Sequence, residues 1–183
     1  VTLGDLDHVF DGTPKSATAT ATAEEPGLEL EITYDGTTNA PTAAGEYEVV
    51  ATVLGINYYG AATGTLRIGR ADQTIDFPAP GNPIQAGTAA LAATASSGLP
   101  VSFAVVAGPG AIENGTNLAF AGAGDVLVAA TQPGDANWNA APAATQAFRR
   151  LAAAIDVDQV RVRENGEGRF FVRLSEAPTA AVV

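Results

Sequence analysis

Few residues in this chain have the types and spacing that catalysis requires. The single histidine, His8, follows Asp7 near the start, and no nucleophile motif lies nearby. A general base needs a nucleophile or a water within reach, so we interpret His8 as a surface or strand-end imidazole. The paired carboxylates Glu24-Glu25 precede Pro26-Gly27, and we expect them to be solvated in a turn. The sequence therefore predicts no enzyme here.

Two aspartates could in principle ligate calcium. Each stands between an aromatic residue and a glycine, in Phe10-Asp11-Gly12-Thr13 and in Tyr34-Asp35-Gly36-Thr37. The same pattern is typical of a tight turn, because aspartate bonds to nearby backbone and glycine completes the reversal. We favour the turn for both positions.

Three aromatic residues are candidates for binding. Tyr58, Tyr59 and Trp138 lie in predicted loops or at strand ends, where an exposed ring could stack on a sugar or on a partner surface. Tyr58 and Trp138 also recur at matching positions of a repeat. That recurrence favours a structural role, in which each ring closes the end of a small core.

Composition excludes several classes of function. The 183 residues carry a net charge of −11, which argues against nucleic acid as a partner because phosphate binding requires basic patches. The absence of cysteine excludes disulfides, thiolate metal sites and a cysteine nucleophile. No apolar run is long enough to span a membrane. The start at Val1 and the apolar end at Val182-Val183 favour a piece of a longer chain.

A repeated phrase organises the chain. Ala44-Gly45-Glu46-Tyr47-Glu48-Val49-Val50-Ala51-Thr52 returns as Ala123-Gly124-Asp125-Val126-Leu127-Val128-Ala129-Ala130-Thr131. Asn57-Tyr58 and Asn137-Trp138 follow the two copies. A period of about 80 residues suits one small all-β domain per copy.

Alternating polar and apolar residues predict strands throughout. The pattern is clear from Ala17 to Thr22, from Leu28 to Tyr34 and from Tyr47 to Val53, with Leu28, Leu30, Ile32 and Tyr34 expected to point inward. Beyond the joint at Gly69-Arg70-Ala71-Asp72, further strands are predicted at 73–77, 89–95, 99–106, 117–121, 125–131 and 144–149. The predicted fold class is all-β: tandem immunoglobulin-like β-sandwich modules plus a C-terminal β-hairpin fragment.

Three segments resemble known families of bacterial modules. Residues 1–70 resemble an MBG-type module in their Phe-Asp-Gly-Thr-Pro opening and in the Ala44–Tyr47 and Asn57–Gly60 stretches. Residues 71–150 are similar to a bacterial immunoglobulin-like repeat in Gln73-Thr74-Ile75 and in the stretch that begins Asn137-Trp138. Residues 151–183 resemble the first hairpin of a Calx-β domain, incomplete after the stretch from Val162 to Val172.

The resemblances imply a non-catalytic role. Such modules belong to large extracellular or cell-surface proteins of bacteria, so they imply a structural or adhesive stalk or spacer whose partners include neighbouring domains of a longer chain. The Calx-β resemblance implies calcium at Glu164, with Glu167 beside it, although two carboxylates supply fewer oxygens than calcium requires. No other cofactor is expected.

Two alternatives remain open. In one, the chain is a filament subunit that joins other copies by β-strand complementation through its terminal strands. In the other, it is a module that binds carbohydrate or a surface through exposed Tyr58, Tyr59 and Trp138. A surface glycan would then be the partner.

Overall fold

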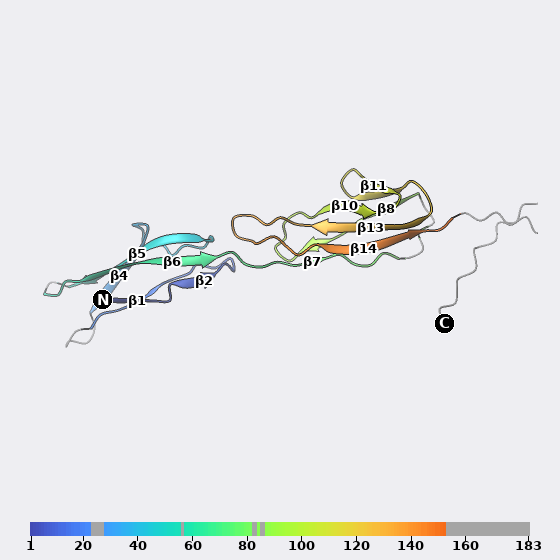
Figure 1. The fold of residues 1–183 in the computed structure, drawn as a ribbon. Coiled ribbons are helices and arrows are strands. Elements are labelled where there is room, and N and C mark those ends of the chain that lie inside the picture. Colours follow the sequence, from blue (N-terminus) through green and yellow to red (C-terminus); the bar gives the residue numbers. More distant parts are fainter. Residues whose placement is uncertain (23–27, 56, 82–83, 85–86, 153–183) are drawn as a thin grey trace, which may run out of the picture. The chain divides into compact units, whose positions relative to one another are not determined.

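The structure, a computed structural model, describes residues 1–22, 28–55, 57–81, 84 and 87–152. All regular elements in this part of the chain are strands, which confirms the predicted all-β, sandwich-type class. The described residues divide into two compact units, and Figure 1 labels most of their strands. Unit 1 comprises Val1–Phe77, Ala93–Ser102 and Ala130–Ala144, and unit 2 comprises Pro78–Ala92, Phe103–Ala129 and the described residues from Thr145 onward.

The main sheet of unit 1 has four strands in the order β2-β6-β5-β4. Its members are β2 (Asp7–Val9), β4 (Glu29–Tyr34), β5 (Gly45–Leu54) and β6 (Ala61–Gly69). β5 is antiparallel to β4 and β6, whereas β2 runs parallel to β6. A second, two-stranded sheet pairs β1 (Thr2–Gly4) with β3 (Thr18–Thr20).

The sequence alternation matches the burial of these strands. Glu29 and Glu31 of β4 are exposed, while the residues predicted to point inward are half-buried or, at Tyr34, buried. In β5, Val49 and Ala51 are fully buried. The period of two thus assigns one face of each strand to the core, as predicted.

The core of this part of unit 1 is thin and depends on a few large side chains. Tyr34, Val49, Leu66 and Ile68 form its centre together with Ala17. The Tyr34 hydroxyl accepts a hydrogen bond of 2.9 Å from the backbone N–H of Ala17, which satisfies the polar end of a buried ring. Leu3 of β1 lies so close to Gly64 of β6 that a Cβ at Gly64 would be 3.0 Å from its Cδ1.

Asp35 and Gly36 form the tight turn that the sequence predicts. Both have positive φ, 46° and 79°, as a type I′ hairpin turn requires. Oδ1 of Asp35 accepts the backbone N–H of Glu48 at 2.8 Å. The residues form the predicted turn, and the Asp35 carboxylate links that turn to β5.

The later strands form three further sheets. Strands β7 (Ile75–Asp76) and β9 (Thr94–Ala95) pair in unit 1. A sheet of order β11-β12-β8 contains Gly110–Glu113, Asn117–Phe120 and Thr88–Ala90, and a sheet of order β10-β13-β14 contains Ser102–Ala107, Gly124–Thr131 and Ala144–Arg150. The single strand predicted over 89–95 is wrong. β8 pairs with β12 and β9 pairs with β7, so the chain changes sheet between them.

The predicted repeat has a structural counterpart in burial. Val49 and Ala51 of β5 are fully buried, and so are Val128 and Ala130, which stand at the matching positions of β13. The repeated phrase thus encodes the same inward face twice.

Candidate functional site

Of the residues considered for catalysis, the structure describes His8 and Asp7. His8, the middle residue of β2, donates a hydrogen bond of 2.8 Å from Nε2 to the backbone oxygen of Asp5. Glu24 and Glu25 lie outside the described residues. No cluster of three or more His, Asp or Glu side chains placed to hold a metal ion occurs in the part of the chain that the structure describes.

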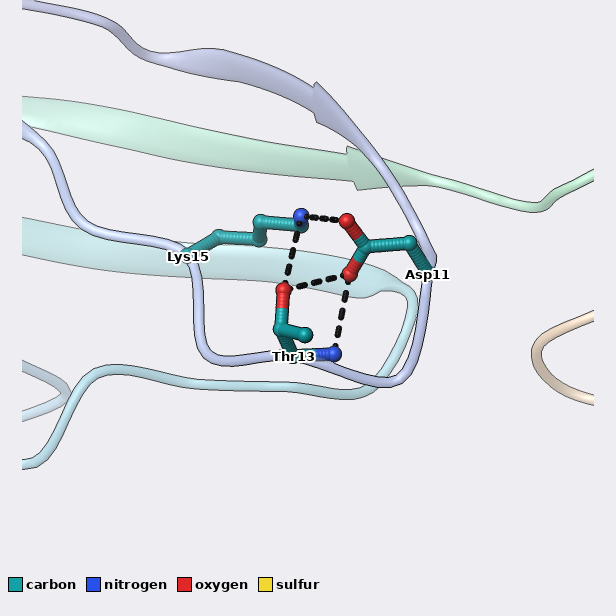
Figure 2. A network of polar contacts seen from close by, with 3 residues as sticks. All are labelled: Asp11, Thr13 and Lys15. Carbon is teal, nitrogen blue, oxygen red and sulfur yellow. Dashed lines mark hydrogen bonds and ion pairs between the residues drawn. The ribbon is translucent and has the colours of Figure 1, made fainter.

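Asp11 organises a loop through its carboxylate. Oδ1 accepts hydrogen bonds from the backbone N–H of Thr13 at 2.9 Å and from its hydroxyl at 2.6 Å, and Oδ2 accepts one from Nζ of Lys15 (Figure 2). The hydrogen bond from Lys15 and those from Thr13 hold the pKa of the Asp11 carboxyl well below its usual range. Both oxygens are thus engaged in the loop, as the turn interpretation expects.

Two of the sequence predictions concern the terminal regions. Glu164, Glu167 and both predicted strands of the Calx-β-like hairpin lie outside the described residues, so that hairpin and its calcium remain predictions. At the N-terminal end, β1, one of the terminal strands considered for strand complementation, pairs with β3 of the same chain. The described residues contain no helix long and apolar enough to cross a membrane.

Tyr58 and Tyr59 lie in the connection between β5 and β6. Tyr59 is 98% exposed and Tyr58 is 39% exposed, and Leu54 at the end of β5 is also exposed. Tyr58 therefore does not close the core in the way that the repeat suggested. All three side chains are exposed, and we name this stretch the tyrosine loop (Leu54, Tyr58 and Tyr59).

Trp138 has a different environment from its repeat counterpart. It is half-buried, and its ring meets Phe10 edge-on with the centroids 5.6 Å apart and the planes at 83°. Phe10 is bonded through its backbone N–H to the carbonyl of Gly69, at the end of β6. The tyrosine loop precedes the start of β6, roughly 25 Å away by the rise of an extended strand. The three aromatic candidates therefore do not form one platform.

The segment around Trp138 is bonded to the chain just after β6. Ala71 donates its N–H to the carbonyl of Asn137 at 3.0 Å and accepts the N–H of Asn139 at 2.8 Å, so that Ala71 and Trp138 form a parallel bridge. We name this contact within unit 1 the joint (Phe10, Ala71 and Asn137–Asn139). This isolated bridge holds the segment that the sequence marked only as a short charged connection.

Side chains reinforce the joint. Asn137 Oδ1 accepts the backbone N–H of Ala44 at 2.9 Å, and Asn139 Nδ2 donates to Asp72 Oδ1 at 2.8 Å. Asp135 Oδ1 accepts the N–H groups of both Asn137 and Trp138, which fixes the loop from within. These contacts account for the Asn-Trp pair, which the sequence marked as a repeat position without indicating its partner.

A buried polar network lies beside the joint, and sequence reasoning missed it. Gln73 is 2% exposed, and its Nε2 donates to Gln132 Oε1 and to the carbonyl of Asn139, both at 2.7 Å. Its Oε1 accepts the hydroxyl of Ser97 at 2.5 Å. Glutamine is usually exposed, so its type gave no signal of burial. Only its place in the predicted strand 73–77, on the same face as Ile75 and Phe77, could have suggested it.

A shallow cleft of about 360 Å³ lies next to the joint. Its wall includes an ion pair at 3.0 Å between Arg67 Nη2 and Glu46 Oε1, both well exposed, and such surface pairs contribute little to stability. The lining offers no hydroxyl, thiol or imidazole for nucleophilic chemistry and consists of Ala44, Gly45, Glu46, Arg67, Ile68, Gly69, Arg70 and Ala136. This composition is unsuited to covalent catalysis.

Comparison with known proteins supports part of the expected family. Residues 1–72 match the MBG domain family, which supports the predicted MBG-type module. The MBG domain is a family of non-catalytic modules. The comparison with curated proteins finds no match. The immunoglobulin-like and Calx-β resemblances remain predictions.

One solved structure is similar over much of the chain. It is the Bacteroides ovatus mixed-linkage glucan utilization locus SGBP-B in complex with a mixed-linkage heptasaccharide, with 14% identity and a TM-score of 0.27. The alignment covers 80% of this chain and 43% of that one, so this chain spans less than half of its length. A likeness at this level carries no argument about function.

Proposed function

We propose that this chain is a non-catalytic spacer in a bacterial extracellular or cell-surface protein, with a module boundary near residue 70 that the joint makes stiff. The MBG match of residues 1–72 supports the kind of protein. The all-β organisation of the described residues agrees with a structural role.

The observation that carries this proposal is the bonding of Ala71. A flexible linker leaves its backbone groups to water, whereas Ala71 is buried and uses both its N–H and its carbonyl in the joint. Trp138 and Asn137 add a ring contact and a side-chain hydrogen bond to the same segment. The connection after β6 is therefore part of a packed unit, and bending there would break several contacts at once.

Stiffness at the joint can be measured with spin labels. Thr65 and Thr94 are both exposed and both belong to unit 1, so Thr65→Cys and Thr94→Cys provide the only two thiols for nitroxide labels. We expect pulsed electron–electron double resonance to give one narrow distribution of distances between the two labels. The double change Asn137→Ala and Trp138→Ala should broaden it, because about 2 kcal/mol of edge-on ring and hydrogen-bond contact is lost.

A matched control removes an aromatic residue outside the joint. Tyr59→Ala removes an exposed ring from the tyrosine loop and should leave the distance distribution unchanged. A wild-type distribution as broad as that of the Asn137/Trp138 variant would show that residues 70–72 act as a hinge. The stiff-spacer proposal would then be abandoned.

A second candidate function is carbohydrate or surface binding by the tyrosine loop. The observation that favours it is the 98% exposure of Tyr59 beside Tyr58, because an exposed aromatic ring can stack on a sugar or on a partner surface. In this proposal Trp138 is not part of the platform, since it packs on Phe10 at the joint.

Glycan-array binding of the full chain tests this candidate. If the tyrosine loop stacks on a sugar, Tyr59→Ala should weaken binding about tenfold or more, as expected for a central aromatic contact. Val9→Ala changes another exposed apolar residue on a different strand and should have no effect. Equal binding by wild type and Tyr59→Ala, or no binding to any glycan, would reject the tyrosine loop as a sugar site.

A further inference from the structure

Strand β10 is an edge strand without the usual protection. It has one neighbour, β13, in the sheet β10-β13-β14, so its other side presents backbone N–H and C=O groups. Proteins normally protect such edges with charged residues, with prolines or by keeping the strand short. β10 has six residues, Ser102–Ala107, and none of them is charged or proline.

The other edge strands in the described part of the chain are protected. β4 carries Glu29 and Glu31, β14 carries Arg149 and Arg150, and β2 carries Asp7. In the sheet β11-β12-β8, β8 has three residues and β11 ends at Glu113. Among the described edges longer than three residues, β10 alone lacks a charge.

The surroundings of β10 are also neutral. The sequence contains no Asp, Glu, Lys, Arg or His from Phe77 to Ile112, although the chain as a whole has a net charge of −11. The charge on the neighbouring strand β13, at Asp125, lies 3.8 Å from the guanidinium of Arg149 on β14. Two copies of an acidic chain repel each other, so they can approach most easily where the local charge is absent.

We propose that β10 pairs with β10 of a second copy of this chain, antiparallel and about a two-fold axis, to form a reversible dimer. Pairing centred on Ala104 sets Ala104 opposite Ala104 of the second copy and Phe103 opposite Val105. Phe103 and Val105 are both half-buried, on the inward side of the strand, so this register keeps the two inward faces on one side. Aromatic and β-branched residues are favourable cross-strand partners.

Among the edge strands of this chain, β10 is the best suited to self-pairing because it carries no charge. A β4–β4 pair would set the exposed carboxylates of Glu29 and Glu31 against like charges, whereas a β10–β10 pair meets none. Exposed Val106, at 59%, would lose part of its contact with water when the second strand is added. About six backbone hydrogen bonds would form, an interface at the weak end of the specific range.

Sedimentation velocity across concentration tests the dimer, with matched lysine variants. Ala104 on β10 and Ala147 on β14 are both exposed alanines at opposite edges of the same sheet. We expect reversible dimerisation of the full chain, weakened about tenfold or more by Ala104→Lys and unchanged in Ala147→Lys. A chain that stays monomeric at all concentrations, or a dimer that survives Ala104→Lys, would overturn the proposal.

A thiol cross-link tests the register independently of that variant. The chain has no cysteine, so Ala104→Cys introduces the only thiol. Opposite residues of an antiparallel pair have Cα atoms about 4.5–5.5 Å apart, which a disulfide can bridge. Under mild oxidation Ala104→Cys should form a covalent dimer at least about tenfold faster than Ala147→Cys. Equal rates in the two variants, with circular dichroism showing both folded, would contradict pairing through β10.

Discussion

Leu66→Ala is expected to lower the free energy of unfolding of unit 1 by about 3 kcal/mol, within the range for truncation of a buried leucine. Leu66 is 0% exposed and belongs to the central strand β6, where it stands opposite Tyr47 of β5. The core there is thin, and its other central members include Val49 and Ile68, which cannot refill the volume of the lost side chain. The loss is a large share of the stability of a small domain.

Urea unfolding followed by the fluorescence of Trp138 measures this loss, because Trp138 is the only tryptophan and lies in unit 1. Leu54→Ala is the matched control, since it makes the same change at a leucine that is 49% exposed. It should cost less than about 1 kcal/mol. If the two variants are destabilised equally, Leu66 is not at the centre of the core.

Long alternating strands were predictable from the sequence, and short ones were not. From Leu28 to Tyr34 the period of two covers seven positions, enough to identify both the strand and its inward face. β2 comprises only Asp7-His8-Val9, where one period gives no usable pattern. Its parallel pairing with β6 depends on contacts between residues about sixty positions apart, which local patterns do not encode.

The binding candidates show a different limit. The repeat correctly placed Tyr58 and Trp138 after equivalent strands, but it could not show that one ring is exposed and the other packs on Phe10. That difference arises because Asn137 and Trp138 meet the segment after β6, while Tyr58 lies in a hairpin connection. Burial of a loop residue depends on which other segment arrives beside it.

Gln73→Leu is expected to destabilise unit 1 by about 3 kcal/mol, although leucine has a similar size. Gln73 is bonded to Gln132, Ser97 and the carbonyl of Asn139, and all buried side-chain polar atoms in the described residues have partners. Loss of the amide leaves several of these groups without a hydrogen bond in a site closed to water, at about 1–3 kcal/mol for each group that finds no substitute. The same Trp138 fluorescence measures the change, and its emission should also shift because Asn139 adjoins Trp138.

A double-mutant cycle separates the network from simple packing. Gln132→Leu alone removes the acceptor of the Gln73 Nε2 hydrogen bond, and the double variant replaces both partners of that bond by apolar side chains. Replacing both partners usually costs less than the two single changes together, so we expect a coupling energy of about 1–2 kcal/mol. Additive losses would mean that the Gln73–Gln132 hydrogen bond contributes nothing beyond packing. In that case the stiffness of the joint would depend on the Ala71–Trp138 bridge, the Phe10–Trp138 contact and the side-chain hydrogen bonds of Asn137 and Asn139. The spin-label distances should then be unchanged in Gln73→Leu.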